Sequence, residues 1–194
     1  MAASRRELLI DTALDLFYRE GFHATGVDRI LAEAGVAKMT LYKHFKSKDE
    51  LILAALRRRD ERFRDWFMRE VERRARTPRE RLLVCFDVLG EWCSGRDFSG
   101  CMFINAAAEF GRQDNPAHAL SAEHKRLLLD YLKTLARAAE AREPEALARR
   151  LGILLEGAIV MAHVCGDRSA AQDAKAAAET LIDEALRAPA PLPI

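Results

Sequence analysis

The chain has 194 residues, of which 49% are hydrophobic and 31% are charged, and its formal net charge is only +1. A chain of this size buries a substantial core, but it is small for two independent enzymatic domains. Charged residues interrupt the apolar N-terminus and no apolar run approaches the roughly 18 residues that cross a bilayer, so we expect no signal peptide, no membrane span and a cytoplasmic location.

Three helices are expected within the N-terminal part of the chain. The first begins at Ser4, because Glu7 three positions later completes a capping-box pattern. The second is expected to be capped by Thr25, with Asp28 as the other half of a capping box. Its apolar residues recur at helical spacing and are Val27, Ile30, Leu31 and Ala34. Gly35 then marks a sharp reversal of the chain, because glycine tolerates a positive φ.

The third helix is predicted over 37–45, and much of its surface is expected to be free for binding a partner. Leu41 and Phe45 stand four residues apart on one face. The segment from Val36 to Lys48 contains no acidic residue, and its lysines are Lys38, Lys43, Lys46 and Lys48. Because the whole chain is nearly neutral, this positive charge is local, as phosphate binding requires. The pattern predicts a unit that reads DNA, and the alternative is a solvated lysine face.

These residues resemble the N-terminal motif of the TetR family of one-component transcriptional regulators. The matching positions are Thr25, Ile30, Ala34-Gly35-Val36, Thr40-Leu41-Tyr42, His44-Phe45, Ser47-Lys48 and Leu51. Positions in the first helix are also similar to the family, and they are Ile10, Ala13, Leu16, Phe17, Gly21 and Phe22. The resemblance covers roughly the first quarter of the chain. It departs from the family at Ala37, where a hydroxyl residue is common, and at Met39, where a small residue is common.

The resemblance implies an all-α fold of about nine helices. It implies an N-terminal three-helix, helix-turn-helix DNA-binding domain over residues 1–48, here called the reader. A C-terminal helical domain for ligand binding and dimerisation is expected over residues 49–187, here called the body. The tail, 188–194, is rich in proline and is expected to be disordered.

Two kinds of DNA contact are expected in the reader. The side chains expected to position the helix against the DNA backbone are Thr25, Tyr42 and Lys48. Thr25 and Lys48 are expected at helix N-termini, where anions bind. Side chains expected at base edges in the major groove are Lys38, Met39, Thr40 and Lys43. His44 either fixes the helix against a phosphate or packs. The partner is therefore expected to be a double-stranded DNA operator.

Helix start signals also divide the body, and no segment reads as a strand. Ser47 with Glu50 begins a long amphipathic helix that leaves the reader and forms a mechanical link to the body. Later helix starts are expected at Thr77-Pro78, Gly100, Asn115-Pro116, Pro144 and Ser169, the last of these with Gln172.

The last two helices predict a homodimer. The helix after Pro144 is apolar around much of its circumference, so one face packs inward and another needs a partner. The final helix carries a stripe of mostly small residues that lets another helix backbone approach closely. The stripe comprises Ala174, Ala178, Leu181 and Ala185. A two-fold, four-helix interface satisfies both helices and is also what the resemblance implies. The alternative is that both helices are internal to a monomer.

A body of this size suggests a small-molecule site. Cys101, Asn105 and Glu109 form a polar stripe in an apolar helix, and His163 lies on an apolar face with Glu156. If these stripes face each other, they line an apolar cavity with a few polar groups. The residues expected to contact the unknown effector are Phe86, Trp92, Cys101, Met102, Asn105, Glu109, Tyr131 and His163. Ordinary core packing is the alternative for each of them.

The sequence thus predicts a ligand-responsive repressor, not an enzyme. Its dimer is expected to span a palindrome, and its ligand is expected to move the long helix and change the separation of the two readers. One alternative is a regulator switched by oxidation of Cys93 or Cys101. Another is a helical enzyme or carrier that uses Cys101, Glu109 and His163 as nucleophile, acid and base. The cysteines form no CxxC pair, so neither a zinc ribbon nor a dithiol centre is indicated, and no cofactor or metal is expected.

Overall fold

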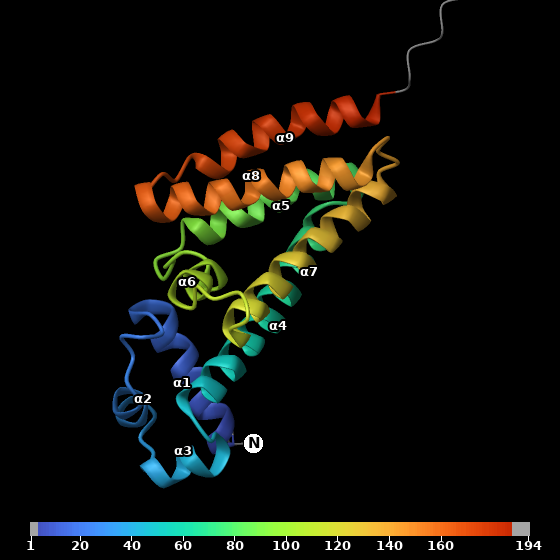
Figure 1. The fold of residues 1–194 in the computed structure, drawn as a ribbon. Coiled ribbons are helices and arrows are strands. Elements are labelled where there is room, and N and C mark those ends of the chain that lie inside the picture. The colour runs from blue at the N-terminus through green and yellow to red at the C-terminus, as the bar shows by residue number, and fades with distance from the viewer. Residues whose placement is uncertain (1–3, 188–194) are drawn as a thin grey trace, which may run out of the picture. The chain divides into compact units, whose positions relative to one another are not determined.

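The computed structural model describes residues 4–187, and this part of the chain folds into nine α-helices without a strand (Figure 1). They are α1 (Arg5–Glu20), α2 (Val27–Ala34), α3 (Lys38–His44), α4 (Lys48–Arg74), α5 (Pro78–Cys93), α6 (Met102–Glu109), α7 (Pro116–Ala138), α8 (Pro144–Cys165) and α9 (Ala170–Leu186). The predicted all-α fold is confirmed. No helix within these residues is long and apolar enough to cross a membrane. The tail predicted to be disordered lies outside the described residues.

The described residues divide into two compact units. The first unit contains residues 4–64 and 101–125, and the second contains residues 65–100 and 126–187. The first unit therefore holds the reader together with α6, the first part of α4 and the first part of α7. The remainder of α4 and α7 belongs to the second unit with α5, α8 and α9.

The first unit is built around the apolar faces of α1, α2 and α3. Phe17 and Phe22 are buried and stack with their ring centres 5.2 Å apart. The predicted cap of α1 is confirmed, because Ser4 Oγ accepts a hydrogen bond of 3.2 Å from the Glu7 N–H. Gly35 ends α2 in the left-handed conformation with φ 62°, as the turn between two short helices requires.

The cap predicted for α2 is wrong. Gly26 occupies the N-cap position, and α2 has no side-chain cap. Thr25 lies one residue earlier and is fully buried, and its Oγ1 donates a hydrogen bond of 2.7 Å to the Gly21 carbonyl. The hydroxyl thus closes the turn after α1, and it makes no capping hydrogen bond to α2.

The second unit contains the side-by-side helices α5, α8 and α9 (Figure 1). The predicted start of α5 is confirmed, because Thr77 and Glu80 form a reciprocal capping box with Pro78 in the first turn. The start predicted at Ser169 is correct in position, but its hydroxyl bonds Asp167 and Asp173 and does not cap α9. The ion pair between Lys175 and Asp87, 2.7 Å long, joins α9 to α5.

Candidate nucleic-acid interface

Helix α3 is held by two apolar residues and presents the rest of its surface to solvent. Leu41 and Phe45 are buried, and Phe45 is the residue that ends the helix. Met39 is 83% exposed and Tyr42 is 49% exposed, although both side chains are large and partly or wholly apolar. Because nothing in the first unit covers them, the outer face of α3 is available for an external partner.

Positive charge surrounds this face. Lys38, Lys43 and Lys46 are exposed, and Lys48 is half-buried at the start of α4. Lys38 Nζ lies 3.9 Å from Asp28 Oδ1. Because both side chains are largely in water, this ion pair neutralises little of the lysine charge. The face therefore keeps the local positive field that the sequence predicts.

The turn between α3 and α4 is fixed by a carboxylate and a hydroxyl. Ser47 Oγ accepts a hydrogen bond of 3.3 Å from the Glu50 N–H, and Glu50 Oε2 accepts one of 2.8 Å from the Lys46 N–H. The Glu50 carboxylate thus bonds the residue before the serine. These contacts hold the backbone of 46–48 in place, so its lysines project from a defined turn.

The other predicted DNA contacts lie close to this face but are less exposed. Thr40 and His44 are half-buried on α3. The buried Thr25 hydroxyl is bonded within the reader, so any contact from this residue to a phosphate comes from its backbone.

The residues predicted to bind an effector fall into both units. The first unit holds Cys101, Met102, Asn105 and Glu109, whereas the second holds Phe86, Trp92, Tyr131 and His163. Cys101 and Met102 are buried, and Lys125 Nζ donates a hydrogen bond of 3.3 Å to Cys101 Sγ.

The predicted effector contacts in the second unit have different surroundings from one another. Trp92 and His163 are joined through Phe98, whose ring meets both edge-on, at 4.9 and 6.0 Å between ring centres. Phe86 is fully buried. Within the described residues, the Tyr131 hydroxyl is the buried side-chain oxygen or nitrogen without a hydrogen-bond partner. Burial raises the pKa of Tyr131, with the nearby Cys85 acting in the same direction.

Glu109 fastens α6 to the reader. Its carboxylate accepts hydrogen bonds from the Phe22 and His23 backbone N–H groups, at 2.9 and 2.6 Å, and lies 2.9 Å from His23 Nδ1. Gly21 lies against it with φ 90°, and the Phe110 ring contacts the rings of both Phe22 and His23. Burial acts to raise the pKa of Glu109, but the hydrogen bonds outweigh it and the pKa lies below its usual value.

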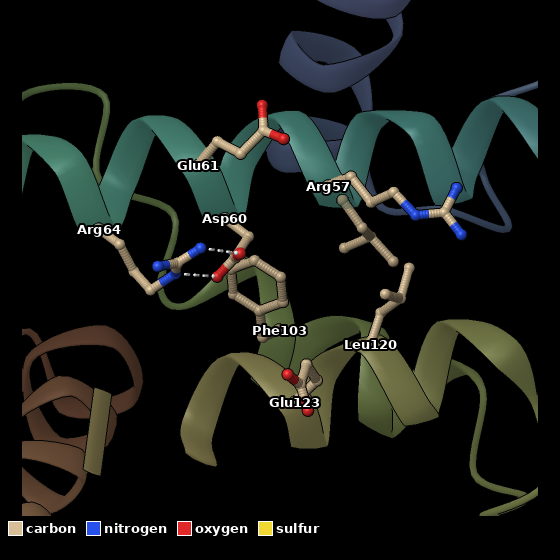
Figure 2. A pocket seen from close by; sticks show the side chains of 8 residues that line it. Arg57, Asp60, Glu61, Arg64, Phe103, Leu120 and Glu123 are labelled. Atoms are coloured by element: carbon tan, nitrogen blue, oxygen red, sulfur yellow. Dashed lines mark hydrogen bonds and ion pairs between the residues drawn. The ribbon is translucent and has the colours of Figure 1, made fainter. Parts of the chain in front are cut away.

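The first unit contains a groove between α4 and the helices α6 and α7, which the sequence did not indicate. Its volume is about 120 Å³, and its lining residues are Leu56, Arg57, Asp60, Glu61, Arg64, Phe103, Leu120 and Glu123. Figure 2 shows the guanidinium of Arg64 paired with the Asp60 carboxylate along α4, at 2.9 and 2.8 Å.

His124 contacts Asp60 and Phe103 of the groove lining, and no sequence signal pointed to this residue either. It is 2% exposed, its Nδ1 lies 2.7 Å from Asp60 Oδ1, and its ring stacks on Phe103 at 3.7 Å between centres. Burial lowers the pKa of His124 to about 4, against the opposing effect of Asp60. No sequence pattern joins residues so far apart. Among the described residues, no group of His, Cys, Asp and Glu is arranged to hold a metal ion.

Comparison with known proteins finds similarity to one group of bacterial regulatory proteins along most of the chain. Residues 9–55 match the family model described as bacterial regulatory proteins of the tetR family, and residues 78–178 match the model described as tetracyclin repressor-like, C-terminal domain. The HTH-type transcriptional regulator YjdC of Escherichia coli is 23% identical over 155 residues, which are 80% of this chain and 81% of that protein. The HTH-type transcriptional activator FasR of Mycolicibacterium smegmatis is 50% identical over 54 residues, 28% of this chain and 25% of that protein.

Solved structures are similar over nearly the whole chain. SCO4454, a TetR-family transcriptional regulator of Streptomyces coelicolor, has a TM-score of 0.87 and 28% identity, covering 94% of this chain and 96% of that one. The tetR-type regulator sav143 of Streptomyces avermitilis has a TM-score of 0.82 and 31% identity, covering 94% of this chain and 98% of that one.

Proposed function

Since the chain belongs to the tetR family of bacterial regulatory proteins, we propose that it is a repressor that binds a palindromic operator as a homodimer and is released by a small molecule. Its coarser role, a DNA-binding transcriptional regulator, follows from the family. The observation that carries the proposal is the outer face of α3, where Met39, Tyr42, Lys38 and Lys43 are exposed.

The proposed reader is residues 1–48, with α3 in the major groove. Lys38, Met39, Thr40 and Lys43 face base edges in this proposal. Tyr42, His44, Lys48 and the backbone at Thr25 bind phosphates and set the register of the helix. The residues after 48 form the proposed domain for ligand binding and dimerisation.

An apolar stripe along α8 supports the homodimer. Ile153 and Val164 are 72% and 73% exposed, and Val160 and Met161 between them are also exposed. The exposed Gly157 continues the stripe at a spacing of three to four residues, so these side chains share one helix face. Such a face fits a second copy of the same helix, with α9 alongside in a four-helix interface.

The proposed effector acts on the body and alters the separation of the two readers. It does so only if it binds one separation more tightly than the other. Candidate contacts in the second unit are Phe86, Trp92, Tyr131 and His163, and those in the first are Cys101, Met102, Asn105 and Glu109. Because Glu109 is bonded to the reader, a ligand that displaces α6 acts directly on the turn between α1 and α2.

Binding to the protein's own promoter region, titrated with salt, tests the function. Tight binding to one short two-fold site with a steep salt dependence is expected, together with its loss in a Tyr42→Ala, Lys43→Ala double variant. Thr134→Ala, an exposed position on α7, is the matched control. Weak binding that is equal for unrelated DNA and unchanged in the double variant contradicts the proposal.

A thiol-switched regulator is a second candidate, and the contact between Lys125 and Cys101 favours it. A cation next to a thiol is one of the settings in which cysteines react. In this alternative, a peroxide oxidises the Cys101 thiol to a sulfenic acid with release of water. Release from DNA by hydrogen peroxide in the wild type, but not in Cys101→Ser, supports this alternative. Equal release from a Cys93→Ser, Cys101→Ser double variant removes it.

A further inference from the structure

Arg6 lies outside the family motif, yet the fold brings it to the end of the recognition helix. It belongs to the first turn of α1. Its guanidinium carbon is 5.3 Å from the centre of the Phe45 ring, and Phe45 is the buried residue that ends α3. Since Lys46 follows Phe45 directly and is exposed, Arg6 adds a second cation to this edge of the reader.

The contact with Phe45 leaves the guanidinium available to a partner. The Arg6 side chain is 48% exposed. One of its five N–H donors bonds the Glu7 carboxylate at 3.2 Å, and stacking on a ring uses none of them. Glu7 is also bonded by Arg58, whose guanidinium is less exposed, so the Glu7 charge is shared between two arginines.

We propose that Arg6 binds a phosphate of the DNA backbone at the flank of the site that α3 reads. This inference rests on the proposed DNA-binding function. A guanidinium presents parallel N–H groups that match two phosphate oxygens, and the Phe45 ring holds its plane in place. A backbone contact of this kind adds affinity and register without sequence preference.

The salt dependence of DNA binding tests this assignment. Each phosphate contact contributes about 0.9 to the slope of log K against log salt concentration. Arg6→Met keeps an unbranched stem over Phe45 but removes the charge. We expect its slope to fall by about 0.9, with a similar loss of affinity for operator and unrelated duplex DNA. Arg19→Met is the matched control, because Arg19 lies in the last turn of the same helix and bonds the Asp15 carbonyl.

An unchanged slope in Arg6→Met overturns the assignment, and so does a loss of affinity confined to the operator, because that indicates base readout. Arg6→Lys separates charge from packing. Recovery of most of the slope in Arg6→Lys supports a phosphate contact, whereas a slope as low as that of Arg6→Met, despite the retained positive charge, overturns it. If the wild type shows no salt-steep binding to any DNA, the proposed function itself fails. A steep wild-type slope that Arg6→Met retains overturns only the role of Arg6.

Discussion

Asp60 of α4 and His124 of α7 are joined by a contact of 2.7 Å between Oδ1 and Nδ1, although 64 residues separate them in the chain. The imidazole is buried under Phe103, and the carboxylate also binds Arg64. Because the carboxylate accepts from Nδ1–H, a neutral ring satisfies this pair with its other nitrogen unprotonated. The contact ties the helix that leaves the reader to the first part of α7.

The His124 pair predicts a loss of stability in mild acid. The folded pKa of His124 is about 4, below its ordinary value near 6.5, so the unfolded chain binds more protons between these two pH values. The free energy of unfolding therefore has its full value above about pH 6.5 and decreases as the pH drops toward 4. We expect a loss of about 2 kcal/mol between pH 7 and pH 5, measured by urea denaturation. His124→Gln is expected to remove most of this pH dependence, and an equal slope in the variant contradicts the prediction.

Loss of the Glu109 carboxylate is expected to loosen the turn between α1 and α2. Glu109→Ala leaves the Phe22 and His23 N–H groups without their acceptor, at a cost of about 1–3 kcal/mol. Faster hydrogen exchange at these two amides and a lower Tm measure the effect. Glu33→Ala, which removes an exposed i,i+4 pair with Arg29, is the control and is expected to cost less than about 0.5 kcal/mol. Equal effects of the two variants are evidence against a special role for Glu109.

Gly100 is expected to tolerate no side chain. Its φ is +79°, and a Cβ atom there would lie 2.7 Å from Cδ2 of the His163 ring. Gly100→Ala therefore combines backbone strain with a steric clash and is expected to cost at least about 1–3 kcal/mol in thermal or chemical denaturation. Gly111→Ala is the control, since nothing lies near its Cβ position. Adding His163→Ala to Gly100→Ala removes the clash but not the strain, so partial recovery is expected.

Charge placed on the α8 stripe is expected to prevent dimerisation. Ile153→Glu with Val164→Glu puts two carboxylates on the proposed two-fold interface, where burial without partners is costly. Sedimentation of the wild type as a dimer and of the variant as a folded monomer is the expected result. Ala138→Glu, at an exposed position on α7, is expected to remain a dimer. A variant that sediments like the wild type places the interface elsewhere.

The sequence by itself determined the helical elements and the motif of the reader. Leu41 and Phe45 at helical spacing, Gly35 after α2, and the capping pairs at Ser4 and Thr77 are local signals, because each links residues within one or two turns. These signals predicted the all-α fold and the exposure of Lys38 and Lys43 on α3 correctly. The cap predicted at Thr25 failed by a single residue, since Gly26 is the N-cap of α2 and the buried Thr25 hydroxyl donates to the Gly21 carbonyl instead of accepting from an N–H of the helix.

Only the tertiary structure decided which distant residues meet. Glu109 binds the backbone of residues 22–23, Asp60 binds His124, and Arg6 lies on Phe45, and none of these contacts leaves a periodic trace in the sequence. A polar side chain on an apolar helix face signals that it needs a partner, but it does not identify that partner. The spacing of Glu109 with Cys101 and Asn105 therefore predicts a ligand contact, but it gives no sign of the two backbone N–H groups of the reader that the carboxylate binds in the fold.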